Sequence, residues 1–214
     1  MYELIVLSLL TLKPLHGYLI AKIINDIIGP YARLSNGRLY PLLAKLQADG
    51  LIAASEDTAH ETGTRRQRTY AITDAGRLRL HDLMMDTTSN PGEYQRLFWL
   101  KVPYVRLLAP HERLYLVDHY ITYCQTHIFH VSAEIEDMRR NGAEYYRVSE
   151  IGVTGMLYSM EHLLAQWRLE LESALQWRAQ MVADAEQLAD AEQVAPQTDE
   201  STIESRDMRG DREP

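Results

Sequence analysis

Four hydrogen-bonding side chains open a short segment whose spacing suits the reading of nucleic-acid bases. They are Ser35, Asn36, Arg38 and Tyr40, and Lys45 follows further along the segment. On a helix, donors near the N-terminal end can reach base edges in the DNA major groove, whereas a lysine two turns later suits a phosphate. We therefore predict that these residues bind DNA; packing of the Tyr40 ring beneath the helix is the alternative for that residue.

Five further residues are predicted to contact the DNA backbone. Arg65, Arg66 and Arg68 cluster where a polar loop turns back into an extended run, and fixed cations of this kind suit phosphates. His16 and Tyr18 stand at the start of another expected helix, where a side chain or a backbone N–H group can hold a phosphate. The alternatives are a solvated hairpin tip for the arginines and a structural role for His16.

The elements that must position these residues follow from apolar spacing and from helix start and stop signals. Helices are expected over residues 1–11, 18–28, 35–48 and 74–85,. Two short alternating runs, at 51–55 and 68–72, predict a β-hairpin with a long polar tip,. Three short helices, a two-stranded wing and a further helix, in this order, make up a winged helix-turn-helix domain.

The segment TTSNPG at 87–92 is rich in turn residues and predicts a domain boundary,. We expect a DNA-binding domain over residues 1–87 and a helical dimerisation and effector domain over 93–190. From residue 195 to 214 the chain lacks aromatic residues and is mostly charged and polar, which predicts a disordered tail,. The predicted fold is therefore mainly α-helical: an N-terminal winged helix-turn-helix domain followed by an antiparallel helical domain.

Two apolar seams run through the second domain. The first runs from Leu114 to Met138 in unbroken steps of three and four, and the second resembles it. Such steps predict a pair of long packed helices. The second seam is predicted to form the interface of a homodimer through Leu157, Met160, Leu164, Trp167 and Leu171. The alternative is that each seam is filled by its neighbour within one chain.

Charge is divided unevenly along the 214 residues, whose formal net charge is −8. Residues 1–80 hold 10 Lys and Arg against 7 Asp and Glu, whereas the remainder holds 12 against 23. A mildly basic front and an acidic back indicate two modules with different partners. One cysteine and no long apolar run favour a cytoplasmic protein with no disulfide and no membrane partner,.

Enzymatic motifs are absent from the sequence: there is no GxSxG, HExxH or CxxC pattern and no phosphate-binding glycine loop. Cys124 lies on the first seam and suits a buried apolar position rather than a nucleophile,. His127, His130 and Glu134 share one helical face, and a metal site there is the alternative to a solvated or interface face,. We predict no enzymatic activity, no cofactor and no metal.

Aromatic residues just past the boundary suggest an effector pocket between the modules. Phe98, Trp99 and Tyr104 would form one wall and Tyr18 the other, because sites for aromatic molecules are lined by such residues. The alternative is that these side chains belong to an interdomain core.

The front of the chain resembles the PadR family of bacterial transcriptional regulators. Four separated blocks carry the resemblance: residues 14–18 (PLHGY), 34–46 (LSNGRLYPLLAKL), 49–52 (DGLI) and 65–76 (RRQRTYAITDAG). The longer C-terminal part is similar in plan to the larger PadR subfamily. At position 38 this chain has Arg where a small hydroxyl residue is common, which implies an altered operator preference.

The resemblance implies a homodimer that places its third helix in the major groove and its wing along the backbone or minor groove. It also implies a repressor that leaves DNA when a small, often aromatic, molecule binds or another signal arrives. We therefore predict a sequence-specific regulator of a pseudo-palindromic operator with half-sites about one turn apart. The alternative function is a protein-interaction regulator that uses the winged fold only for docking.

Overall fold

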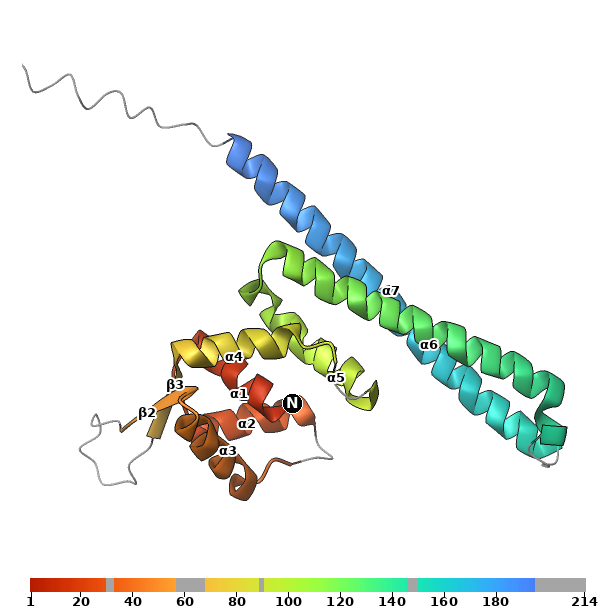
Figure 1. Cartoon of the computed structure of the whole chain (residues 1–214), viewed down its shortest axis with the longest axis horizontal. Helices are drawn as coiled ribbons and strands as arrows, with labels where there is room; N and C mark the ends of the chain where they lie inside the picture. The colour runs from red at the N-terminus through yellow and green to blue at the C-terminus, as the bar shows by residue number, and fades with distance from the viewer. Residues whose placement is uncertain (30–32, 57–67, 89–90, 146–149, 195–214) are drawn as a thin grey trace, which may run out of the picture.

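The computed structural model describes residues 1–29, 33–56, 68–88, 91–145 and 150–194. The first part of the chain folds into the expected order of helices and hairpin (Figure 1). Its elements are α1 (Tyr2–Leu12), β1 (Leu15–His16), α2 (Gly17–Ile28), α3 (Asn36–Ala48), β2 (Ile52–Glu56), β3 (Arg68–Ile72) and α4 (Asp74–Met85). The prediction of a mainly helical chain with an N-terminal winged helix-turn-helix arrangement is confirmed.

The sheet has one strand more than the two that the sequence predicted. Its order is β1-β3-β2, with both neighbouring pairs antiparallel, and β1 pairs Leu15 with Tyr70 and His16 with Thr69. A strand of two residues is too short to show alternation, and its pairing partner lies more than fifty residues away. The wing itself is the predicted two-stranded hairpin of β2 and β3, and β1 extends it at its base to a three-stranded sheet.

The core of this domain is organised around α1. Every residue from Leu4 to Leu10 is buried, because α1 packs against α2, β3 and α4 at once. A helix that is apolar all round has no polar face to offer to water, so it becomes the centre of the domain. Two of the elements that carry predicted DNA-binding residues, α2 and β3, pack directly against α1.

The base of the wing is fixed by a polar corner between β2, β3 and α4. Thr73 is the N-cap of α4, and its hydroxyl oxygen accepts a hydrogen bond from the Gly76 N–H at 3.0 Å. The same hydroxyl donates to the Gly50 carbonyl oxygen at 2.7 Å, and Gly50 adopts a left-handed φ of 72° that favours glycine,. Two sequence blocks that lie far apart in the chain thus meet at one corner.

The rest of the chain forms a linker and a long helical arm. Its elements are α5 (Pro91–Lys101), the 3₁₀ helix η1 (Val102–Leu107), α6 (Pro110–Tyr145) and α7 (Glu150–Val194). The helices α6 and α7 run side by side in opposite directions and project away from the N-terminal domain (Figure 1). Ion pairs from Arg178 to Asp118 and from Arg139 to Glu161 fix the antiparallel register along the arm.

The second seam contacts α6 of the same chain. Leu164 and Trp167 are buried in a cluster with the first seam, and the other three predicted dimer residues, Leu157, Met160 and Leu171, pack against this cluster. Two long seams joined by a short connection find each other first within one chain, since closing a short loop costs little entropy. Within one chain these five residues therefore pack as the alternative expected, and their assignment to a surface between chains stays a prediction.

The linker contributes to the packing of both parts of the chain. Tyr94 and Phe98 of α5 belong to the core of the arm, whereas Val105 and Leu108 belong to the core of the first part. The predicted boundary at 87–92 stays a prediction, and the tail at 195–214 lies outside the described residues. Within the described ranges, no helix has the length and apolarity that crossing a bilayer requires.

Candidate nucleic-acid interface

The predicted base-reading segment is a helix with one face buried and the other open to solvent. Leu39, Leu43 and Leu46 of α3 are buried in the N-terminal core, which fixes the rotation of the helix. The five residues of this segment that were predicted to bind DNA point outward, and all are exposed: Ser35, Asn36, Arg38, Tyr40 and Lys45. Apolar residues at spacings of three and four therefore decide which donors α3 presents.

Three cations of this face have no carboxylate partner among the described side chains. Arg38 and Lys45, two turns apart on α3, and Arg68 at the start of β3 are exposed. Among the described residues none of the three forms an ion pair with a carboxylate. Guanidinium and ammonium groups without a partner remain available for phosphates. Arg65 and Arg66 lie outside the described residues, so their placement stays a prediction.

Tyr40 packs on α2 rather than beneath α3. A β-carbon built on Gly17 would lie 3.1 Å from Cε1 of Tyr40 and 3.5 Å from Cε2 of Tyr70, so the glycine leaves room for both rings. The Tyr40 ring is still 47% exposed, and Tyr18 is 74% exposed one residue beyond Gly17. The motif around Gly17 therefore presents two tyrosines near the start of α2.

His16 is tied into the sheet. Its Nδ1 atom lies 3.0 Å from the Thr69 hydroxyl, which faces it across the β1–β3 pair. His16 also occupies the N-cap position of α2 without a side-chain capping bond. This contact supports the structural alternative for His16, and its predicted role in DNA binding stays a prediction.

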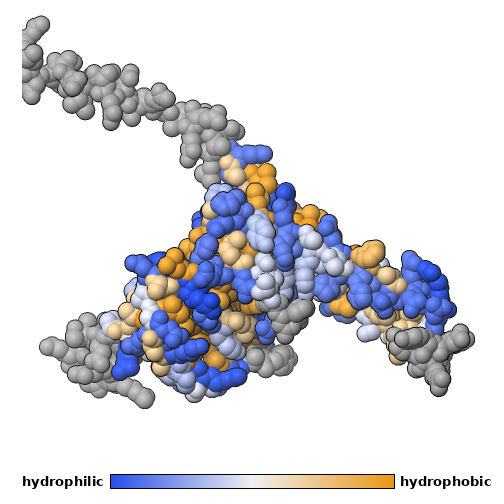
Figure 2. All heavy atoms as spheres, viewed as in Figure 1, coloured by the Kyte–Doolittle hydropathy of each residue, from blue (hydrophilic) through white to orange (hydrophobic). Residues whose placement is uncertain are grey.

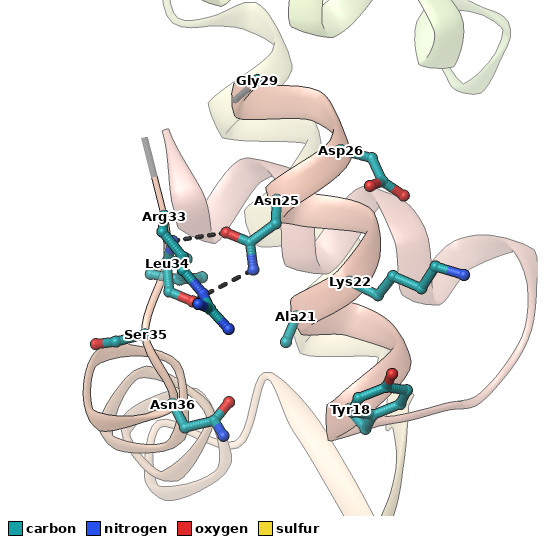
Figure 3. Close-up of a pocket in the computed structure, with 10 residues that line it drawn as sticks. All are labelled: Tyr18, Ala21, Lys22, Asn25, Asp26, Gly29, Arg33, Leu34, Ser35 and Asn36. Atoms are coloured by element: carbon teal, nitrogen blue, oxygen red, sulfur yellow. Dashed lines mark hydrogen bonds between the residues drawn. The ribbon is translucent and has the colours of Figure 1, made fainter. Parts of the chain in front are cut away.

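A groove of about 830 Å³ lies between α2 and the start of α3. Figure 3 shows Tyr18 and Asn36 at one end of this groove and Gly29 at the other. Two of its lining cations, Lys22 and Arg33, were not among the predicted site residues. The signal that could have found them is proximity to the helix-turn-helix turn, since cations that flank such a turn lie beside the residues that read bases.

The predicted effector pocket does not assemble. Phe98 is 2% exposed and stacks on Tyr120 with ring centroids 3.7 Å apart. Trp99 lies beside it in the same cluster, whereas Tyr104 packs on the N-terminal core. Tyr18 lines the groove at α3 instead. The prediction of one shared pocket is therefore corrected: three of the rings belong to two separate core clusters, and the fourth, Tyr18, is exposed. Large aromatic rings near a helical junction tend to bury one another.

One carboxylate joins the linker to both helices of the arm. Oε2 of Glu170 on α7 accepts hydrogen bonds from Trp99 Nε1 at 2.6 Å and from the Tyr120 hydroxyl at 2.7 Å. Burial, followed by the bond to Glu170, raises the pKa of Tyr120 far above its usual range. The aromatic cluster thus fixes α5 against α6 and α7 and thereby sets where the arm leaves the N-terminal domain.

Of the residues weighed for metal or covalent chemistry, His127 and Cys124 take part in packing, whereas His130 and Glu134 are exposed. The His127 ring stacks on Trp167 with centroids 4.2 Å apart and planes inclined by 6°, and burial lowers its pKa. Cys124 is fully buried, and burial raises the pKa of its thiol to about 12. A protonated thiol is a poor nucleophile at neutral pH.

A buried lysine connects the linker to the end of α4. Lys101 is 4% exposed, and its Nζ donates to the Asp86 backbone carbonyl oxygen at 2.6 Å. Burial lowers the pKa of this ammonium group to about 8. Because the unfolded chain retains the proton to higher pH, the free energy of unfolding gains a contribution that rises between pH 8 and the ordinary lysine value.

We expect Lys101→Met to remove this rise. The measurement is urea unfolding of the unaltered protein and the variant at a series of pH values between 7 and 10 (a range set by the lowered pKa of about 8). The free energy of unfolding of the unaltered protein should rise relative to that of the variant as the pH increases. Two parallel curves would contradict a buried ammonium group at this position.

Comparison with known proteins gives a family match for the front of the chain and similar solved structures over most of its length. Residues 6–82 match the "Transcriptional regulator PadR-like family". The "Negative transcriptional regulator PadR" of Bacillus subtilis (strain 168) is 27% identical over 107 residues, which span 50% of this chain and only 58% of that regulator.

Among solved structures, the chain is similar to Bacillus subtilis PadR in complex with operator DNA, with a TM-score of 0.38 and 19% identity over 84% of this chain and 96% of that one. It is also similar to the Vibrio cholerae virulence activator AphA, with a TM-score of 0.33 and 18% identity over 88% of this chain and 99% of that one.

Proposed function

Because residues 6–82 match the PadR-like family of transcriptional regulators, we propose that the chain binds operator DNA as a homodimer and represses transcription. The observation that carries this proposal is the outer face of α3, where exposed donors lie beside cations that no carboxylate neutralises in the described part of the chain. Donors read base edges and cations hold phosphates. The name of the Bacillus subtilis relative, a negative regulator, supports repression over activation.

The proposed dimer uses the side of α7 that faces away from α6. Ile151, Tyr158 and Leu169 are 85%, 78% and 64% exposed. Tyr158 follows Ile151 by seven residues and Leu169 follows it by eighteen, which is about two and five helical turns. The three side chains therefore lie along one line on the helix. We call these three residues the outer stripe. Figure 2 shows apolar residues among hydrophilic ones along the arm, and a second copy of the chain would remove such a stripe from water.

A dimer of this kind would present two α3 helices to one face of the duplex. Two-fold symmetry of the protein requires a pseudo-palindromic site, with half-sites about 34 Å apart, or one turn of B-DNA. Release from DNA by a small molecule or another signal completes the proposal. The proposal names no input site, because the four aromatic residues expected to form it do not all lie together in the structure.

Salt dependence of binding tests the proposal against the docking alternative. A duplex enriched from a random pool by repeated selection on the protein serves as the preferred site, and a scrambled duplex of equal composition as the control. Several phosphate contacts require that affinity fall steeply with added salt, by roughly 0.9 logarithmic units per contact for each decade of salt. Failure to enrich any duplex, without salt-dependent affinity for either one, would favour a protein-docking module.

Two substitutions in α3 should distinguish contacts to bases from contacts to phosphates: Arg38→Ala and Lys45→Ala. We expect Arg38→Ala to weaken the preferred duplex by about 1–3 kcal/mol and to relax its sequence preference. Lys45→Ala should weaken preferred and scrambled duplexes alike and reduce the salt slope by about one. Fluorescence anisotropy with both duplexes at several salt concentrations measures this, and equal losses on both duplexes for Arg38→Ala would contradict its assignment to bases.

A further inference from the structure

Asn25 bridges the two sides of the helix-turn-helix turn. Its side chain projects from α2 across the groove toward Leu34 (Figure 3). Oδ1 accepts a hydrogen bond from the Leu34 N–H at 2.7 Å, and Nδ2 donates to the Leu34 carbonyl oxygen at 3.4 Å. The backbone carbonyl of Asn25 accepts a bond from the Gly29 N–H at 3.2 Å. One residue therefore closes the end of α2 and holds the chain where it returns to α3.

The held residue is directly connected to the base-reading helix. Leu34 is 3% exposed in the N-terminal core, and the next residue, Ser35, is the N-cap of α3. The carbonyl oxygen of Ser35 accepts the N–H groups of Arg38 and Leu39, both at 3.0 Å. A shift of Leu34 would therefore be passed to the first turn of α3, which carries Asn36 and Arg38.

We propose that Asn25 is a positioning residue for sequence recognition: its amide holds Leu34 and thereby aims the first turn of α3 at the bases. This inference rests on the proposed function. Asn25 does not need to touch DNA to act in this way. Hydrogen bonds to base edges depend on alignment, whereas exposed cations follow phosphates over a wider range of geometry. Loss of the clamp should therefore reduce discrimination between sequences more than it reduces general affinity.

Two substitutions separate the clamp from other roles of the residue. Asn25→Ala removes both bonds to Leu34. Asn25→Asp retains an oxygen that accepts the Leu34 N–H but places a negative charge in the groove, which should weaken all duplexes alike. The control is Lys22→Ala on the same helix, whose exposed ammonium group also lines the groove and which should weaken both duplexes equally.

The ratio of affinities for the preferred and scrambled duplexes is the main readout. We expect Asn25→Ala to lower this ratio about tenfold, the value of one well-aligned base contact. Asn25→Asp should keep a ratio close to that of the unaltered protein despite lower affinity for both duplexes. An unchanged ratio in Asn25→Ala, with or without a fall in Tm, would overturn the proposal and leave Asn25 a structural residue.

Amide hydrogen exchange at Leu34 tests the clamp without DNA. We expect the Leu34 N–H to be protected in the unaltered protein and in Asn25→Asp, and to exchange roughly tenfold faster in Asn25→Ala. An unprotected Leu34 amide in the unaltered protein would overturn the clamp itself. If the protein shows no preference for any duplex while Leu34 is protected by Asn25, the proposed function fails and the positioning role for sequence recognition falls with it.

Discussion

Gly76→Ala is expected to lower the free energy of unfolding by about 3 kcal/mol, at the upper end of the usual cost of overpacking. A β-carbon on Gly76 would overlap the backbone carbonyl oxygen of Leu51 and lie 2.8 Å from Cγ1 of Ile72. The carbonyl oxygen cannot rotate away as a flexible side chain could, because it belongs to the backbone and also accepts the N–H of Thr73 at 3.1 Å. The first turn of α4 must therefore move away from the base of the wing.

Chemical denaturation followed by circular dichroism measures the effect. The matched control is Gly37→Ala in α3, where the new β-carbon would meet only the Ser35 hydroxyl oxygen at 3.8 Å. Gly37 is the second residue of α3, so the change should leave stability unaltered or raise it by less than the roughly 0.5–1 kcal/mol expected in a helix interior. Equal stability of the two variants would show that the corner between Leu51 and Gly76 is looser than the structure indicates.

Leu169→Glu is expected to convert the protein from a dimer to a monomer at micromolar concentration. Leu169 is 64% exposed on the outer stripe, so a single chain gains a solvated carboxylate there at little cost. In the proposed dimer the same carboxylate would be buried against the partner without a cation, which costs several kcal/mol. Because two linked recognition helices bind as one unit, the monomer should also lose about 10²–10⁴-fold in affinity for the preferred duplex.

Two control variants separate loss of the dimer from the general effects of an added charge. Leu78→Glu introduces the same charge at a leucine of α4 that is 72% exposed, and the oligomeric state should not change. Leu164→Glu places the charge in the seam between α6 and α7, where the side chain is 9% exposed, and it should lower the stability of the arm. Sedimentation velocity decides the outcome: a Leu169→Glu variant that remains a dimer would place the interface elsewhere.

The sequence was sufficient to predict the helices and the hairpin of the N-terminal domain because their signals are local. Leu39, Leu43 and Leu46 lie at helical spacing and are buried together, so the opposite face with Arg38 and Lys45 follows directly. Thr73, directly before the expected helix at 74–85, is a residue type that favours the N-cap, and its hydroxyl oxygen accepts the N–H of Gly76,. Periodicity and capping depend on neighbours within one or two turns, which the sequence displays.

The partner of each surface was decided only in three dimensions. The seam with Leu164 was predicted to pack against a second chain, but within one chain it is filled by α6. An apolar stripe in a sequence indicates that the stripe will be covered, but it does not indicate which element covers it. Phe98 and Tyr18 could have met, yet one stacks on Tyr120 and the other lines a groove. The bond from Asn25 to Leu34 follows no periodicity. Composition and spacing fix which faces avoid water, whereas the pairing of those faces depends on the competition among all of them in the folded chain.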